Sequence, residues 1–487
     1  MSTALTHHSM YIGGAWTDSE SGATIESTSP ATGEPIGSVP EGTREDAQRA
    51  IAAANAAARE WAARSAFERA AAMERVAAII EERRDDLART LTLDQGKPLQ
   101  AEAYSEVDEL VEYWKMAAAD GRRLEGLMPP SVDATKRVLA YRVPRGVVGV
   151  ITPWNWPYTM AAEVVAPALA SGNTVVWVPA SSTSVCSVKL AECVADAELP
   201  PGVFNLVTGP GSVVGDELAV NPGTHAIGFI GSIATGQKVA ERAAGKPQLL
   251  EMGGNGPLVV LEDADLDAAV EATLAAAFLC AGQSCTAGER FLVHEDVHDE
   301  YLDKLAAKVA AEIRLGDPFA DETTMGPLNN EPTAAKMDEH VGDAVERGAE
   351  LVAGGARADG FPTTLYYAPT VLDGVTEEME VAREETFGPV VPITTIRSED
   401  EALAAIDSSP FGLLTAVFTE DLRRGLRFAE AARAGWVNVN ESTNYWESHL
   451  PFGGRAGSDS GVGRVGGRFS METFTELKTV IVNLGNK

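Results

Sequence analysis

The sequence contains few cysteines and no long apolar run. Its four cysteines in 487 residues are too few for a disulfide scaffold. Cys280 and Cys285 form no CxxC pair and have no histidine cluster near them in sequence, so no metal site is expected. The sequence has no stretch of about 18 apolar residues that could cross a membrane, and its N-terminus lacks a signal-peptide pattern. We therefore expect a soluble, cytoplasmic protein without a metal.

Lysine is also scarce, and acidic residues outnumber basic ones. The chain has 39 Lys and Arg, of which 11 are Lys, against 71 Asp and Glu, which gives a formal charge of −32 at pH 7. A chain with this charge repels nucleic acid and anionic membranes, so neither is an expected partner. A GC-rich genome and a high-salt cytosol both produce this composition, and the sequence does not separate them.

The order of predicted elements indicates an α/β protein. Residues 44–64, 66–94 and 104–118 have a helical pattern, and Thr43 is placed to cap the first of them. Short β-branched runs then alternate with helical segments, and a second alternating set covers 289–441. This alternation predicts mostly parallel sheets covered by helices on both faces, in two α/β layers. Ligands of such sheets bind at the carboxyl ends of the strands.

Two glycine-rich segments are candidates for binding a phosphate group. "GPGSVVG" (209–215) lacks the GxGxxG spacing and is interpreted as a connecting loop. "FIGSIATGQKVA" (229–240) predicts a strand, a turn at Gly231 and Ser232, and a helix whose first N–H groups can hold a pyrophosphate. Taken alone, that motif is explained equally well as a plain strand-to-helix turn.

Two short motifs place single polar residues in apolar surroundings. Asn155, in "PWNWP", lies between two tryptophans and two prolines and could supply a rigid amide donor to an oxyanion. Glu251, in "LLEMGG", ends an apolar run, where a raised pKa would suit a general base. In isolation, each motif is better explained as a turn or helix cap.

Cys285 stands among small residues in "AGQSCTAGER" (281–290). Its neighbours leave the sulfur accessible, and a thiolate is a strong nucleophile. The usual alternative is an inert buried thiol. We favour that alternative for Cys186 and Cys193, which lie on a helical pattern.

Together and in this order, the motifs resemble those of the aldehyde dehydrogenase superfamily. PWNWP, GSxxxG, LExGG, GQxC, EExFGP and PFGG follow one another as in that family, from "MYIGGAW" to "FTELKTV". The interval of 34 residues between Glu251 and Cys285 is also similar. The resemblance implies an α/β fold with two Rossmann-like domains and a small β oligomerisation arm.

The resemblance also implies how the chain is divided. Residues 1–121 and 143–252 would form the cofactor-binding domain, and residues 253–457 the catalytic domain. Residues 122–142 and 458–487 would form the oligomerisation arm. The resemblance also implies a homo-oligomer, either a dimer or a tetramer.

The same resemblance assigns roles to single residues. Cys285 would attack the aldehyde carbon, Asn155 and the backbone N–H of Cys285 would hold the oxyanion, and Glu251 would activate water to hydrolyse the thioester. NAD(P)+ would be the cofactor. The residues implied to bind it are Thr152, Pro153, Trp154, Val178, Ser181, Gly211, Gly231, Ser232, Gly236, Glu385 and Phe387. The residues implied to line the substrate tunnel are Trp156, Tyr158, Met160, Glu163, Leu279, Tyr445, Trp446 and Phe452.

At two places the sequence departs from the family's pattern. Val178 and Ser181 stand where the family usually has a lysine and often a glutamate at the adenosine ribose. We therefore expect NAD+ to be favoured over NADP+ and to bind weakly. The loop "PFGGRAGSDSGVGR" is longer than the family's and lacks its lysine, which bears on the substrate class.

The mostly aromatic and apolar tunnel residues predict an uncharged aromatic or medium-chain aliphatic aldehyde. Two alternatives stay open. One is a semialdehyde dehydrogenase acting on an anionic substrate, for which Arg455 is close enough in sequence. The other is a CoA-acylating relative, which the presence of Glu251 disfavours. A non-catalytic relative is disfavoured because Cys285, Glu251 and Asn155 are all present.

Overall fold

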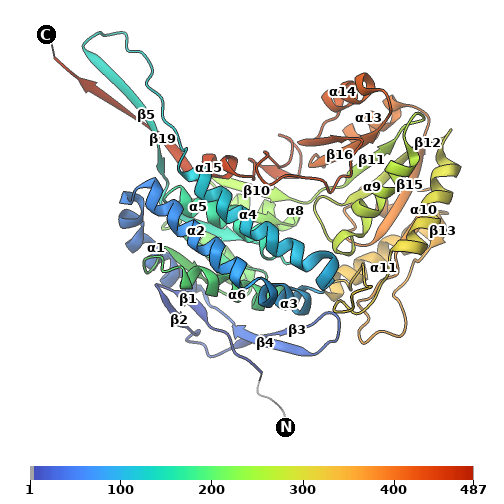
Figure 1. The fold of residues 1–487 in the computed structure, drawn as a ribbon, viewed down its shortest axis with the longest axis horizontal. Helices are drawn as coiled ribbons and strands as arrows, with labels where there is room; N and C mark the ends of the chain where they lie inside the picture. The colour runs from blue at the N-terminus through green and yellow to red at the C-terminus, as the bar shows by residue number, and fades with distance from the viewer. Residues whose placement is uncertain (1–4, 486–487) are drawn as a thin grey trace.

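The computed structural model describes residues 5–485, and its larger sheet has eight strands (Figure 1). Their order is β18-β10-β9-β6-β7-β8-β1-β2. The parallel centre consists of β10 (Gln248–Met252), β9 (Ala226–Gly231), β6 (Val147–Ile151), β7 (Thr174–Val178) and β8 (Phe204–Leu206). The antiparallel edges are β18 (Gly461–Val462), β1 (Met10–Ile12) and β2 (Ala15–Thr17).

The strand order of this sheet reverses between β6 and β9. β7 and β8 follow on one side of β6, whereas β9 and β10 lie on the other side. The crevice at the carboxyl ends of two such strands is where open α/β sheets bind their ligands. Thr152, after β6, and Gly231, at the end of β9, stand at that crevice.

The second sheet has seven strands in the order β13-β14-β15-β12-β11-β16-β17. All are parallel except the edge strand β13. The strands are β11 (Gly256–Val260), β12 (Gly288–His294), β13 (Glu350–Ala353), β14 (Thr370–Asp373), β15 (Val390–Ile396), β16 (Leu414–Phe418) and β17 (Trp436–Val439). Separate apolar cores lie on its two faces, as the predicted α/β layers require.

Helices cover both sheets (Figure 1). Thr43 caps α1 (Arg44–Ala63) as predicted, since its side chain accepts a hydrogen bond from the Asp46 N–H. The run predicted over 66–94 is two helices, α2 (Ala66–Glu82) and α3 (Arg84–Gln95), because the chain turns at Arg83. The longer helices that follow are α4 (Tyr104–Gly121), α5 (Thr159–Ala170), α6 (Ser184–Asp196), α8 (Ile233–Arg242), α9 (Leu266–Phe278), α10 (His298–Glu312), α11 (Glu331–Glu346), α13 (Glu399–Asp407) and α14 (Leu422–Ala431). The shorter ones are α7 (Asp216–Val220), α12 (Glu380–Arg383) and α15 (Arg468–Phe474).

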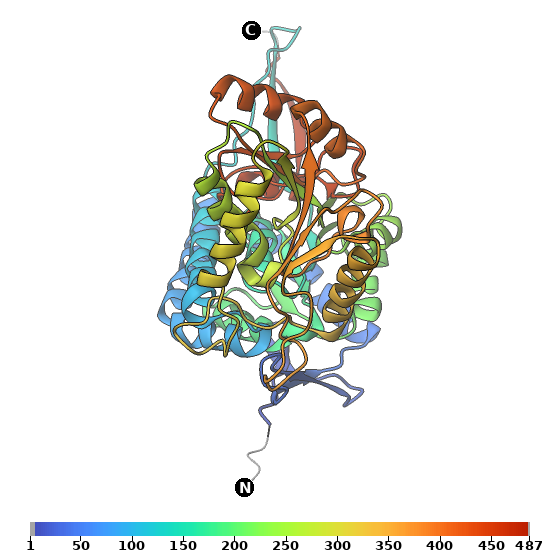
Figure 2. The same cartoon turned by 90° about the vertical axis from the view of Figure 1, so that its right-hand side faces the viewer.

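A two-stranded ribbon projects from the body. It pairs β5 (Lys136–Pro144) with β19 (Thr475–Asn483) in antiparallel register. Figure 2 shows this ribbon and the hairpin β3 (Thr24–Thr28)–β4 (Pro35–Pro40) at opposite ends of the molecule. Between the body and the ribbon, β18 pairs with β10 and α15 packs on α5, so residues 461–474 lie on the body. The fold class is the predicted one, and the domain boundaries stay a prediction.

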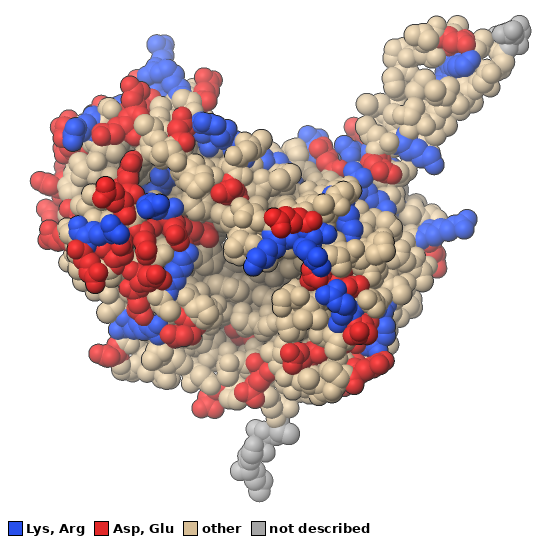
Figure 3. Space-filling model, turned by 180° about the vertical axis from the view of Figure 1, so that it is seen from behind, with Lys and Arg blue, Asp and Glu red and all other residues tan. Residues whose placement is uncertain are grey.

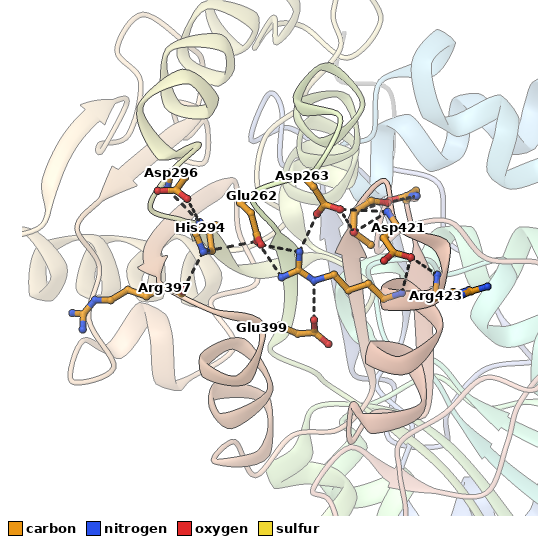
Figure 4. A network of polar contacts seen from close by, with 11 residues as sticks. Glu262, Asp263, His294, Asp296, Arg397, Glu399, Asp421 and Arg423 are labelled. Atoms are coloured by element: carbon orange, nitrogen blue, oxygen red, sulfur yellow. Dashed lines mark hydrogen bonds and ion pairs between the residues drawn. The ribbon is translucent and has the colours of Figure 1, made fainter.

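Arg424, on α14, pairs with acidic residues near the carboxyl end of β11, of which Glu262, Asp263 and Glu399 are labelled in Figure 4. Its guanidinium group lies 2.8 Å from Glu399 on α13. It lies 3.0 Å from Glu262 and 3.2 Å from Asp263, which follow β11. Asp263 also accepts a hydrogen bond from Thr419 Oγ1 at 2.7 Å. The guanidinium group of Arg424 thus joins α13 and α14 to the segment that follows β11.

The surface of the molecule is acidic, as the composition requires. Seen from behind, acidic side chains gather over the lobe built on the second sheet, opposite the ribbon (Figure 3). Within residues 5–485, no helix is long and apolar enough to cross a membrane. The same residues contain no group of His, Cys, Asp and Glu arranged to hold a metal ion. The cytoplasmic location stays a prediction.

Candidate active site

Two cavities meet at Cys285. The outer cavity has a volume of about 320 Å³ and lies at the carboxyl ends of β6 and β9. The predicted cofactor residues that line it are Pro153, Trp154, Gly231, Ser232, Glu385 and Phe387. The predicted substrate residues that line the inner cavity are Trp156, Met160, Glu163, Leu279, Trp446 and Phe452. Glu251 and Cys285 line both cavities, so an occupant of either one reaches the thiol.

A tight loop after α9 presents Cys285. Cys280 and Ala281 both have φ of 53°, in the left-handed region, and Gly282 has φ of 73°. A Cβ atom on Gly282 would lie 2.1 Å from the carbonyl oxygen of Gly388, so the close approach of these two segments requires glycine here. Non-glycine residues held in the left-handed region are found preferentially at active sites. The conformation of the loop is thus specified by contacts outside it.

The thiol of Cys285 is buried between the two cavities. The residue is 9% exposed. Burial raises the pKa of its thiol well above the usual value, and the carboxyl groups of Glu251, Glu385 and Glu163 add to that increase. Because the thiolate is the nucleophile, this thiol needs a base beside it.

Glu251, at the end of β10, is the carboxyl group that lines both cavities beside this thiol. It is 3% exposed, and its Oε1 atom has no hydrogen-bond partner among the described residues. Burial raises the pKa of Glu251 to about 8, although the neighbouring Cys285 thiol lowers it. A carboxyl group with a pKa near neutrality can both take and release a proton at the working pH.

Asn155 lies on the outer cavity beside the cysteine loop. It is buried, and its Nδ2 atom donates a hydrogen bond to the Gln283 carbonyl at 3.0 Å. Because an amide nitrogen carries two protons, the second can serve an oxygen in the cavity. The neighbouring Trp154 packs edge-on against Phe387, with 5.6 Å between ring centroids. The "PWNWP" motif therefore gives a fixed amide donor near the thiol rather than a helix cap.

The turn between β9 and α8 has the geometry of an anion site. Gly231 has φ of 159°, and Ser232 precedes α8 without capping it through its side chain. The first N–H groups of a helix without such a cap are available to an anion. Gly236 serves packing instead: a Cβ atom there would lie 2.0 Å from Met252 Sδ. These residues thus fit a pyrophosphate-bearing cofactor in the outer cavity.

The far wall of the outer cavity comes from the segment after α12. Glu385 is half-buried, lines the cavity and accepts a hydrogen bond from the Gly254 N–H at 2.9 Å. Burial raises the pKa of Glu385 to about 7. Glu289 fixes the next turn, because its carboxylate accepts hydrogen bonds from the N–H groups of Thr386 at 2.8 Å and Phe387 at 2.9 Å. The buried carboxylate of Glu289 therefore fixes the turn that carries Phe387.

Six predicted site residues lie outside the lining of the two cavities, in addition to Gly236. Thr152 is buried and accepts a hydrogen bond from Trp177 Nε1 at 2.8 Å. Val178 is fully buried in an apolar core, which corrects the expectation that its side chain faces the ribose. Ser181 Oγ donates to the Gly209 carbonyl at 3.3 Å, and Gly211 begins a π-helical turn.

Tyr158 and Tyr445 also differ from their expected positions on the tunnel. Tyr158 is fully buried, and its hydroxyl donates to the Leu87 carbonyl at 3.1 Å. Tyr445 is 48% exposed and donates to Glu447 at 2.9 Å. Met160 and Trp156 line the inner cavity, because the turn before α5 points them toward it and points Tyr158 toward α3.

The structure also brings to the site residues that no motif indicated. Lys336, on α11, lines the outer cavity and donates a hydrogen bond to the Glu385 carbonyl. Glu109, on α4, and Asn444 line the inner cavity. The inner cavity therefore has two carboxylates, Glu109 and Glu163, besides Glu251. This acidic lining depends on which sides of α4 and α5 face the cavity in the folded chain.

Comparison with known proteins agrees with this geometry. The sequence profile described as "Aldehyde dehydrogenase family" matches residues 16–480. A succinate-semialdehyde dehydrogenase (NADP(+)) of Escherichia coli strain K12 is 39% identical, covering 97% of each chain. The solved structure of a succinate-semialdehyde dehydrogenase from Burkholderia pseudomallei has a TM-score of 0.95 at 39% identity, covering 99% of each chain. That of a betaine aldehyde dehydrogenase from Staphylococcus aureus, in complex with NAD+, has a TM-score of 0.95 at 33% identity, covering 99% of this chain and 96% of that one. The chain belongs to the aldehyde dehydrogenase family.

Proposed function

We propose that the protein oxidises an aldehyde to the carboxylic acid with NAD(P)+ and water, through covalent intermediates on Cys285. The observation that carries this proposal is the contact of Cys285 with Glu251 where the two cavities meet. Glu251 takes the thiol proton as the sulfur bonds to the aldehyde carbon. Asn155 and the backbone N–H of Cys285 donate to the oxygen of the resulting thiohemiacetal.

The second half of the reaction is hydrolysis of a thioester. The nicotinamide, when bound, accepts the hydride that leaves the thiohemiacetal carbon. Glu251, with its pKa of about 8, first releases the thiol proton to solvent and then takes a proton from a water molecule that attacks the thioester carbonyl. The carbon–sulfur bond breaks, the acid leaves, and the thiol regains its proton. One buried carboxyl group thus serves both halves.

The cofactor would lie in the outer cavity. The N–H groups at the start of α8 would hold its pyrophosphate, and Glu385 and Phe387 would hold the nicotinamide ribose and ring. Both NAD+ and NADP+ occur in the names of relatives. Because neither a lysine nor an acid stands at positions 178 and 181, we propose that NAD+ is favoured and NADP+ accepted.

The names of the relatives bear on the substrate. Relatives from Pseudomonas species are named glutarate-semialdehyde dehydrogenases, at 38% and 39% identity. These names support the semialdehyde alternative better than the aromatic or medium-chain aldehyde that the sequence predicted. An anionic semialdehyde is therefore the second candidate substrate. The CoA-acylating alternative stays disfavoured, because Glu251 is present and placed to activate water.

We also propose that the protein is a homo-oligomer assembled through the β5–β19 ribbon. Large apolar side chains of this ribbon are exposed, among them Tyr141, Leu477 and Ile481. Exposed apolar side chains on a projecting ribbon favour burial against another copy. Light scattering after size-exclusion chromatography is expected to give a dimer or tetramer, whereas a monomer at micromolar concentration would contradict the proposal.

The activity itself has a direct test. Purified protein is mixed with butanal and either NAD+ or NADP+, with and without CoA, and reduced cofactor is followed by absorbance. We expect reduced cofactor and free butanoate in equal amounts, with no effect of CoA. Butanoyl-CoA as the main product would reject the hydrolytic assignment, and no reduced cofactor in any mixture would reject the proposed function for this aldehyde.

A further inference from the structure

The inner cavity has an unusual lining for an apolar tunnel. Three aromatic side chains, those of Trp156, Trp446 and Phe452, share it with the carboxyl groups of Glu109 and Glu163. Trp446 and Phe452 lie 6.0 Å apart between ring centroids, nearly edge to face. Among residues 5–485, no lysine or arginine lines this cavity. The charged side chains that line it are therefore all acidic.

Glu163 is the more deeply buried of the two carboxyl groups. It is 2% exposed and lies on α5. Tyr113 Oη donates the only hydrogen bond to its carboxyl group in the described chain, at 3.5 Å, and no cation pairs with it there. Burial raises the pKa of Glu163 well above its usual value, and the charges of Glu251 and Glu109 raise it further. A buried carboxyl group without a cation beside it is costly unless it is neutral or a ligand supplies the charge.

Glu109 is in a similar state one helix away, on α4. Burial raises its pKa to about 7, and Glu106 raises it while Lys97 lowers it. Lys97 does not neutralise the cavity, because its Nζ atom lies 2.6 Å from Glu106. That ammonium group also lies 3.1 Å from the ring centroid of Trp156. The nearest buried cation is thus already paired, and both carboxyl groups of the cavity lack one.

We infer that the inner cavity selects aldehydes that carry an ammonium group at the end remote from the carbonyl. This inference rests on the proposed function and specifies its substrate class. The ammonium group would lie beside Glu163 and Glu109, where it pairs with their carboxylates. The rings of Trp446 and Phe452 add faces on which cations are stabilised. A carboxylate at the same place would meet two like charges and no cation.

The charge of the substrate also bears on the nucleophile. The Glu163 carboxyl group is one of those that hold the pKa of the Cys285 thiol high. A cation beside Glu163 offsets that effect, so the thiolate forms more readily when the substrate is bound. An anion there opposes thiolate formation. Selection by charge should therefore act on kcat as well as on KM.

Three aldehydes with a shared two-methylene spacer separate the possibilities. β-Aminopropanal ends in an ammonium group, butanal in a methyl group and succinate semialdehyde in a carboxylate. With wild-type protein and saturating NAD+, we expect kcat/KM for β-aminopropanal to exceed that for butanal by about tenfold or more, and succinate semialdehyde to be the poorest of the three. If succinate semialdehyde is the best substrate, the inference is overturned.

The variant Glu163→Gln keeps the shape of the side chain and removes its charge. It should lower kcat/KM for β-aminopropanal, and the ratio of that value to kcat/KM for butanal, by about tenfold or more. Glu109→Gln should do the same to a smaller extent, because Lys97 offsets part of its charge. Glu346→Gln, at an exposed glutamate of α11, is the matched control and should change neither. An equal loss for all three aldehydes in Glu163→Gln would show a merely structural role and would overturn the inference.

Butanal distinguishes a failed inference from a failed proposed function. If butanal is oxidised and the ammonium preference is absent, only the inference fails. If no aldehyde is oxidised, the proposed function fails, and binding still tests the cavity through unreactive alcohols. Calorimetry should then show β-aminopropanol binding to wild type more tightly than butanol or γ-hydroxybutyrate, and losing that advantage in Glu163→Gln. Equal or weaker binding of the amino alcohol would overturn the inference.

Discussion

The two cavities that meet at Cys285 are built in different ways. The outer one lies at strand ends and helix starts: the turn at Gly231, the N-terminus of α8 and the segment of Glu385 and Phe387. The inner one is formed by side chains of helices, such as Glu109 of α4 and Glu163 of α5. The turn and helix start of the outer cavity suit a cofactor with a pyrophosphate group. Single side chains of the inner cavity can be replaced without disturbing the fold. We therefore expect the outer cavity to determine which cofactor binds and the inner cavity to determine which aldehyde is accepted.

The largest effect is expected where the two cavities join. Cys285→Ser should keep the fold but lower aldehyde oxidation by about three orders of magnitude or more, because a hydroxyl group is far less ionised than a thiol. The loss should be the same for every aldehyde and for both cofactors. Steady-state rates check this, with Cys280→Ser as the control. Cys280 is buried and lines neither cavity, so it should contribute little. Activity retained in Cys285→Ser but lost in Cys280→Ser would exchange the two assignments.

A change confined to the outer cavity should weaken cofactor binding and leave the preference among aldehydes unchanged. Lys336→Met removes the hydrogen bond to the Glu385 carbonyl and with it part of the support of that segment. A lost hydrogen bond of a charged donor costs about 1.5–3 kcal/mol, so the KM for both cofactors should rise by about tenfold or more. The ratio of kcat/KM values among aldehydes should stay the same. Glu163→Gln is the matching inner change and should have the opposite pattern. If Lys336→Met alters aldehyde preference, the division between the cavities does not hold.

The pH dependence sharpens the role of the shared base. Glu251 acts on water only when ionised, and its pKa of about 8 lies above its usual value because of burial. The rate of deacylation should therefore rise about tenfold per pH unit below pH 8 and level off above it. The turnover of p-nitrophenyl acetate after its initial burst isolates this step. A rate that is flat from pH 6 to pH 9 would mean that Glu251 is ionised throughout or is not the base.

The smallest effect is expected at the adenosine end of the cofactor. Ser181→Glu introduces a partly buried acid beside the expected 2′-phosphate. Repulsion of about 1 kcal/mol should lower kcat/KM for NADP+ by about fivefold and leave that for NAD+ unchanged within about twofold. Val178→Lys is a poorer probe, since Val178 is fully buried and the new charge would disturb the core. In wild type, a tenfold preference for NADP+, about 1.4 kcal/mol, would contradict the favoured use of NAD+.

Much of the fold was predictable because its signals are local. Alternating strand and helix patterns gave both sheets, and Thr43 marked the start of α1. The break at Arg83 was not visible, since both flanking segments are good helix formers. The projecting ribbon pairs segments more than 330 residues apart, and only the resemblance to a family indicated it.

The site was predictable where motifs carry it and not elsewhere. Gly231 and Cys285 lie in short motifs whose spacing fixes the backbone. Tyr158 was misplaced because the turn before α5 sets which side chain faces the cavity, and that phase is a property of the folded turn. Lys336 and Glu109 come from distant helices that carry no motif. The charge of the inner cavity therefore became visible only in the structure.

The most direct test of the central claim is the kinetics of Glu251→Gln after rapid mixing with butanal and NAD+. The variant keeps a hydrogen-bonding side chain beside Cys285 but cannot take a proton from water. We predict a burst of about one NADH per active site that forms more slowly than in wild type, because the thiol of Cys285 also loses its base. The steady rate that follows should be at least about 100-fold below wild type, and mass spectrometry should detect a butanoyl group on Cys285. A steady rate equal to that of wild type, with no acyl group on the enzyme, would contradict the account.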